Sequence, residues 1–219
     1  MRKLLCIMLL VLLGAQGAGA QTGKAKVIVA SISKHYAEVK EYSGKMAAAY
    51  ADSRIEAEQM MDNEAWPPSI YQTTIMQNLP GTGPHKETFR FFYYEEKDYE
   101  SEGGPYFMRK IHFATVSYNF AARNYKEEYL FDEQGNLIYV YGRNYDTNMY
   151  VEVDFRLYFD KGKLIHAMLE GRDNEKDAFT PIPSTLPLQD RFMHMVKQYQ
   201  QDAKKVKALF EAINTAQHS

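Results

Sequence analysis

The sequence predicts an α+β fold, in which a curved antiparallel meander of six or seven strands is packed by an N-terminal and a C-terminal helix. Apolar residues recur at the helical period near both ends of the chain, whereas the middle alternates apolar and polar residues with period two. Short connections join the alternating segments, so neighbours in sequence should be neighbours in the sheet. The 17 Tyr and 12 Phe suit packing across strands.

Residues 1–20 have the pattern of a cleaved secretory signal peptide. MRK is a basic start, LLCIMLLVLLGA is an apolar stretch, and AGA before Gln21 is a small-residue cleavage site. The apolar stretch is shorter than the about 20 residues that span a bilayer. Cys6, the only cysteine, lies too early to be a lipid-attachment site. We therefore expect an exported protein, periplasmic or secreted, with no transmembrane segment after signal cleavage.

Residues 21–219 are predicted to form a single α+β domain. A chain of this length can bury a core that is stable without disulfides. The whole chain has 26 basic and 28 acidic residues, and this balance argues against nucleic acid as a partner, since such binding needs a basic face.

The first helix is predicted from residue 24 to about residue 61. It ends before Trp66-Pro67-Pro68, because proline cannot continue a helix and restricts the residue before it. Its apolar positions at helical spacing are Ile28, Ile32, Tyr36, Val39, Met46 and Tyr50.

Seven segments then follow the strand period. They are residues 69–78, 87–96, 106–120, 125–131, 137–141, 150–159 and 164–169. In segment 150–159 the apolar residues fall on one face and Glu152, Asp154 and Arg156 on the other, which predicts a strand with its polar side outward.

Two similar stretches, FDEQGNL (131–137) and FDKGKL (159–164), are predicted to be hairpin turns. Glycine supplies the positive φ that a tight turn needs, and aspartate bonds back to the turn backbone. Neither has the ligand spacing of a calcium loop, so no metal site is expected. The loop NLPGTGPH (78–85) leads into a strand rather than a helix, which argues against a phosphate site and favours an exposed loop for a partner.

The second helix follows a polar, proline-rich crossing at residues 171–187, with Ser184 or Thr185 as its expected cap and Pro187 in its first turn. Its apolar stripe favours packing on the sheet over a coiled-coil seam. Both helices are expected on one face of the sheet. The stripe comprises Phe192, Val196, Tyr199, Ala203, Val206, Phe210 and Ile213, with Lys197, Lys204, Lys205 and Lys207 beside it.

Candidates for catalysis are few. The six histidines are scattered and no serine stands in a nucleophile motif. The remaining hypothesis is acid–base chemistry by His112 or His166 with Glu152 or Asp154, converging in the concavity of the sheet. No cofactor is implied.

The surplus of tyrosine over phenylalanine indicates a partly wet aromatic surface, because tyrosine keeps a polar tip. Such a surface suits a glycan, an apolar small molecule or another protein. The expected ligand-binding residues are Trp66, Asn78, His85, Tyr94 and Tyr118.

Three segments together resemble a group of small exported proteins of Bacteroidota without an assigned activity. They are QNLPGTGPHKE (77–87), YNFAARNYKEEYLFDEQGNL (118–137) and RLYFDKGKLIHA (156–167). The resemblance implies a bacterial, exported setting and no catalytic residues. We therefore expect a non-enzymatic binding or interaction protein. The alternatives are a small hydrolase or isomerase, and a structural subunit that associates through a strand edge or the C-terminal stripe.

Overall fold

The structure is a computed structural model, which describes residues 23–47, 69–81, 83–98, 106–120, 123–146, 151–174 and 176–216. No helix among these residues is long and apolar enough to cross a membrane.

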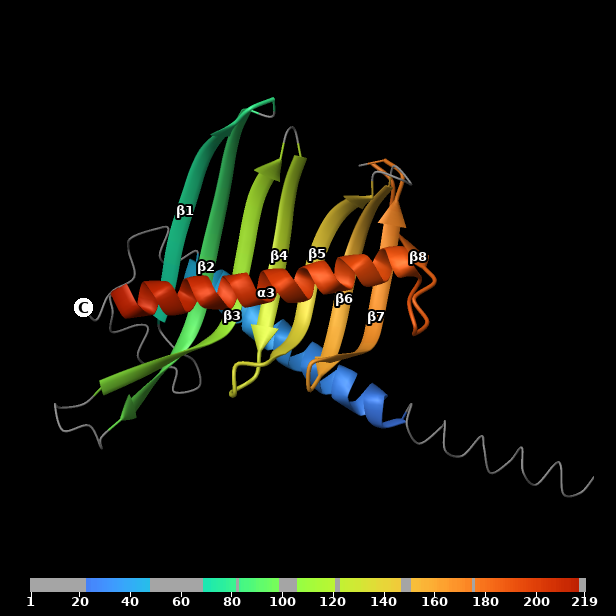
Figure 1. Cartoon of the computed structure of the whole chain (residues 1–219). Helices are drawn as coiled ribbons and strands as arrows, with labels where there is room; N and C mark the ends of the chain where they lie inside the picture. The colour runs from blue at the N-terminus through green and yellow to red at the C-terminus, as the bar shows by residue number, and fades with distance from the viewer. Residues whose placement is uncertain are drawn as a thin grey trace, which may run out of the picture.

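Eight antiparallel strands form one open sheet in the order in which they follow along the chain (Figure 1). This confirms the predicted meander. The additional strand, β8, pairs with β7 inside the segment expected to be irregular. The strands are β1 (Ser69–Leu79), β2 (Gly83–Asp98), β3 (Tyr106–Phe120), β4 (Arg123–Phe131), β5 (Leu137–Asp146), β6 (Val151–Asp160), β7 (Lys163–Arg172) and β8 (Thr180–Ile182).

Tight turns at β1–β2, β4–β5 and β6–β7 set the register. Leu79 pairs with Gly83, so the stretch NLPGTGPH is a hairpin whose ends belong to β1 and β2 and whose residues Asn78, Pro80, Gly81 and Pro84 are exposed. Asp132 accepts hydrogen bonds from the backbone N–H groups of Gln134 and Asn136, at 3.0 and 2.7 Å. In the second Phe-Asp turn Asp160 pairs with Lys163 across two residues. Both Phe-Asp stretches are confirmed as turns.

The two helices lie on opposite faces of the sheet, so the expectation that both cover one face is wrong. α3 (Asp190–Ala216) crosses the near face in Figure 1, and the helix at residues 23–47, here the N-terminal helix, crosses behind it. The central strands bury consecutive residues, one on each face, and therefore need cover on both sides. Such consecutive pairs are Phe91 and Phe92, Phe113 and Ala114, and Tyr129 and Leu130.

α3 buries its predicted stripe against the sheet, from Phe192 to Phe210. It begins at Asp190, later than expected, and Ser184 and Thr185 do not cap it. The Gln189 carbonyl instead accepts from the N–H groups of Phe192 and Met193, at 2.9 and 3.0 Å. Residues 48–61 of the first predicted helix lie outside the described residues.

Candidate functional site

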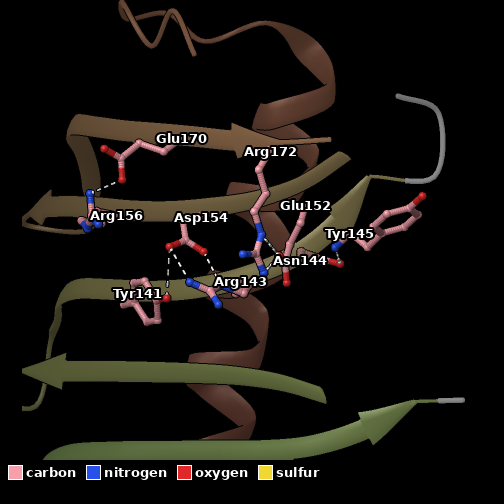
Figure 2. A network of polar contacts seen from close by, with 9 residues as sticks. All are labelled: Tyr141, Arg143, Asn144, Tyr145, Glu152, Asp154, Arg156, Glu170 and Arg172. Atoms are coloured by element: carbon pink, nitrogen blue, oxygen red, sulfur yellow. Dashed lines mark hydrogen bonds and ion pairs between the residues drawn. The ribbon is translucent and has the colours of Figure 1, made fainter. Parts of the chain in front are cut away.

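Asp154 of β6, a predicted catalytic carboxylate, lies on the face of the sheet that the N-terminal helix crosses. The Arg143 guanidinium of β5 donates two hydrogen bonds to it, at 2.6 and 3.0 Å, and the Tyr141 hydroxyl donates a third at 3.2 Å (Figure 2). The sequence placed Asp154 on an outward polar side, but its side chain is only 6% exposed. Its partners on β5 cover it and satisfy the charge that its burial would otherwise leave unpaired.

The same network continues across β6 and β7. Arg172 donates to Glu152, and Arg156 donates to Glu170 at 2.8 Å (Figure 2). Phe179 lies beside Arg172, with its ring centroid 4.7 Å from the guanidinium carbon. A general base needs a carboxylate oxygen within reach of a substrate proton, and these oxygens already accept from arginines. The network joins three strands, β5, β6 and β7.

The structure does not bring either predicted histidine to these carboxylates. His112 lies on β3, and β6 is three strands away in the sheet. At the usual spacing of strands, β3 and β6 are about 14 Å apart. Burial and the nearby His35 lower the pKa of His112 to about 4. His166 lies on β7, four residues along from Glu170, the register partner of Asp154. That offset is about 13 Å, well beyond hydrogen-bond reach.

The residues expected to bind a ligand fall into separate places. Trp66 lies outside the described residues. Asn78 and His85 share the β1–β2 hairpin, and the ring centroid of His85 is 6.3 Å from that of Tyr118. Tyr94 lies nine residues along β2 from His85, about 30 Å away in an extended strand. The five residues therefore do not form one site.

Tyr118 contacts a buried carboxyl group under α3. Its hydroxyl donates to Glu127 at 3.1 Å, and the Tyr129 hydroxyl donates to the other carboxyl oxygen. Burial raises the pKa of Glu127. Tyr199 of α3 is packed over Gly142, the register partner of Glu127, and none of the described residues hydrogen-bonds to its hydroxyl.

Metal binding has no support among the residues that the structure describes. No three His, Cys, Asp or Glu side chains gather there closely enough to hold an ion.

A cavity of about 550 Å³ lies between α3 and the two Phe-Asp turns. We call it the lysine groove. Its charged lining consists of Lys197, Lys204 and Lys207, all from α3. Its floor consists of the partly exposed Leu137 and of Phe131 and Phe159, at the ends of β4 and β6, which are almost wholly buried.

The walls of the lysine groove are tied together by two hydrogen bonds. Gln200 Nε2 donates to the Gly162 carbonyl at 3.3 Å, and Lys207 Nζ donates to the Gly135 carbonyl at 3.0 Å. Each bond joins α3 to one of the two turns, and both glycines have positive φ, 76° at Gly162 and 74° at Gly135. The turns that repeat in the sequence therefore form one side of a single groove.

A second cavity, of about 610 Å³, adjoins the lysine groove on the other side of the Lys207–Gly135 contact. Tyr94, one of the expected ligand residues, lines it. Its charges are mixed, because Glu95 and Arg109 form an ion pair at 2.8 Å in its wall. The lysine groove and this cavity together follow one flank of α3.

The lysines of the groove were visible in the sequence only as residues off the apolar stripe. Lys197, Lys204 and Lys207 have spacings of seven and three, which place them on the same flank of a helix. What the sequence did not provide was the direction in which α3 crosses the sheet, and hence which turns this flank meets.

Comparison with protein families, with curated proteins and with solved structures found no match for this chain. The resemblance to exported proteins of Bacteroidota stays a prediction.

Proposed function

We propose that this chain is an exported, non-enzymatic binding protein whose ligand is a small anionic amphiphile in the lysine groove. Such a ligand has a carboxylate, phosphate or sulfate head and an apolar body. One observation carries the proposal: every charged residue that lines this 550 Å³ cavity is a lysine.

The charge of the groove selects the head group. The described lining residues include three lysines and no acidic residue, so the local potential favours an anion. Lysine ammonium groups are compact charges on flexible stems and can reach a bound anion from several directions. The amide groups of Asn136, Gln200 and Gln201 in the same lining can donate further hydrogen bonds.

The floor and the size of the groove select the rest of the ligand. Among the apolar lining residues Leu137 is partly exposed, whereas Phe131 and Phe159 belong to the core and are 2% and 1% exposed. Leu137 and the methylene stems of the lysines suit an alkyl or aromatic body. Ligand sites commonly measure about 300–1,000 Å³ and combine an apolar lining with a few polar groups. A free inorganic anion would leave this floor uncovered.

One further observation supports binding rather than catalysis, and another supports export from the cell. Glu152 and Asp154 are held by arginines away from both candidate histidines. The first twenty residues have the three parts of a secretory signal.

Calorimetric titration tests the proposal with dodecanoate, dodecyl phosphate and the uncharged dodecanol, each below its micelle concentration. We expect both anions to bind and dodecanol to bind at least about tenfold more weakly, a difference of about 1.4 kcal/mol. Affinity for the anions should fall with added salt, because exposed charges are screened.

A pair of charge-matched variants locates the site. Lys197→Glu/Lys204→Glu should weaken anion binding at least about tenfold. The control Lys86→Glu/Lys176→Glu makes the same change in net charge at exposed positions outside the groove and should bind as the unaltered protein does. The proposal fails if neither anion binds, or if the two double variants lose binding equally.

A further inference from the structure

The two edges of the sheet differ in how well they are protected. β8 closes one edge with only three residues, of which one is Pro181. β1 forms the other edge with eleven residues, SIYQTTIMQNL, none of which is charged or proline. Edge strands of soluble proteins are usually short, or interrupted by lysine, proline or a bulge, because an open edge pairs with other chains.

β1 is also regular. All eleven of its residues pair with β2 without a shift of register, from Ser69 opposite Tyr93 to Leu79 opposite Gly83. In the part of the chain that the structure describes, β1 pairs with β2 alone. The backbone groups on its outer side therefore form a continuous row that a further strand can match.

Two apolar side chains stand exposed in the same strand. Met76 is 77% exposed and Ile75 is 37% exposed. They point to opposite faces of the sheet, because successive residues of a strand alternate. A strand added beside β1 would cover part of both.

We infer that β1 is a dimerisation edge, and that its occupant is β1 of a second copy of this chain, added antiparallel. A two-fold axis places each residue near the axis opposite itself or a close neighbour. Like charges directly opposite destabilise a strand pair, so a charged strand would resist such self-pairing. β1 carries no charge to oppose it.

The centre of the strand fits this arrangement. With the axis at Thr74, each Thr74 faces its copy, and Gln72 faces Met76 of the other protomer. Threonine–threonine pairs across strands are favourable. The two eight-stranded sheets would then continue as one. This inference does not rest on the proposed ligand, because the lysine groove lies along α3 and the β4–β5 and β6–β7 turns.

Sedimentation velocity across about two decades of protein concentration tests the inference, because a dimer dissociates on dilution. Thr74 and Met76 are exposed on one face of β1 and accept charges without entering the core. We expect the unaltered protein to form dimers, and Thr74→Lys/Met76→Lys and Thr74→Glu/Met76→Glu to be monomeric when each is alone. A mixture of the two variants should restore a dimer with one copy of each.

Met168→Lys provides the matched control, since Met168 is an exposed methionine on β7. It should dimerise as the unaltered protein does, and circular dichroism should show that all variants keep the same fold. An unaltered protein that stays monomeric overturns the inference, and so do charged variants that still dimerise. A mixture that stays monomeric excludes pairing of β1 with its own copy.

Discussion

Glu127 and Glu128 are neighbours on β4, both are buried, and they face opposite sides of the sheet. Glu127 lies under α3, where burial raises its pKa even though Tyr129 and Tyr118 donate hydrogen bonds to it. For Glu128 burial also acts to raise the pKa, but hydrogen bonds from Lys126 and Tyr36, with the charge of Lys126, outweigh it. The net result lowers the pKa of Glu128.

The difference follows from the partners on each face of the sheet, where Lys126 of β4 itself acts on Glu128 together with residues of the covering helix. The N-terminal helix contributes Tyr36 and Lys40, and the Lys40 ammonium lies 3.3 Å from the Glu128 carboxylate. α3 instead sets Asp202 near Glu127, and its negative charge further raises the pKa of Glu127. Similar burial of the same residue type thus has opposite electrostatic consequences on the two faces. The partners decide the outcome, because both carboxyl groups are desolvated.

On the face of the sheet that α3 covers, an added side-chain atom should lower the stability of the fold more than on the opposite face. Gly142→Ala tests this and has the largest expected effect. A Cβ at Gly142 would lie 2.5 Å from the ring of Tyr199, whose side chain is buried by the sheet. We expect the free energy of unfolding, measured with urea, to fall by about 3 kcal/mol because the core becomes overpacked.

The matched change for the opposite face is Gly44→Ala, in the N-terminal helix. A Cβ at Gly44 would meet no atom within 4 Å, and alanine favours the helix over glycine by up to about 1 kcal/mol. We therefore expect this variant to gain stability. A neutral Gly142→Ala variant would show that α3 does not hold Tyr199 against β5.

Glu128→Gln should have the next largest effect, because it removes a buried charge from two lysines and a tyrosine. We expect a loss of about 2 kcal/mol near pH 7, since hydrogen bonds to charged groups are worth about 1.5–3 kcal/mol. The folded pKa of Glu128 is lowered, so its contribution is present above the unfolded pKa and is lost as the pH falls through the folded pKa. The two proteins should therefore converge in acid.

The control for this loss is Glu38→Gln, which changes an exposed glutamate of the N-terminal helix. Glu38 is half exposed and lies 3.8 Å from Lys34, and surface pairs of this kind contribute about 0–1 kcal/mol. Urea unfolding at a series of pH values compares both variants with the unaltered protein. Equal losses in the two variants would remove the special role assigned to the buried carboxylate.

The sequence could predict those parts of the fold that depend on local pattern. The meander, the stripe of α3 and both Phe-Asp turns follow from periodicity and turn chemistry. The separation of the helices onto two faces had a weaker signal, in runs such as FRFF (89–92) and EYLF (128–131), where consecutive apolar residues need burial on both sides.

The candidate site was mostly beyond prediction, because it depends on how distant segments meet. Asp154 is held by Arg143 only because the β5–β6 register places these two residues opposite each other. The lysine groove likewise depends on the path of α3 across the two turns. Its two hydrogen bonds, from Gln200 to Gly162 and from Lys207 to Gly135, join residues that are 38 and 72 positions apart in the sequence. Neither the register nor the crossing direction can be obtained from periodicity.

Glu127→Gln should have the smallest effect and the opposite sign to Glu128→Gln. The folded pKa of Glu127 is raised, so the folded state binds the proton more tightly than the unfolded chain. Stability therefore falls as the pH rises from the unfolded pKa through the raised folded pKa. Glutamine keeps the shape without the charge, and we expect it to stabilise the protein by about 1 kcal/mol above that window.

The pH dependence separates this effect from a general improvement in packing. Below the unfolded pKa of glutamate, about 4.3, the unaltered protein already carries a neutral Glu127 and the advantage of the variant should disappear. Urea unfolding at acidic and at mildly alkaline pH measures this. The prediction is wrong if Glu127→Gln is more stable than the unaltered protein by the same amount at every pH. It is also wrong if this variant loses stability at alkaline pH as Glu128→Gln does, because a buried carboxylate would then have the same effect on both faces.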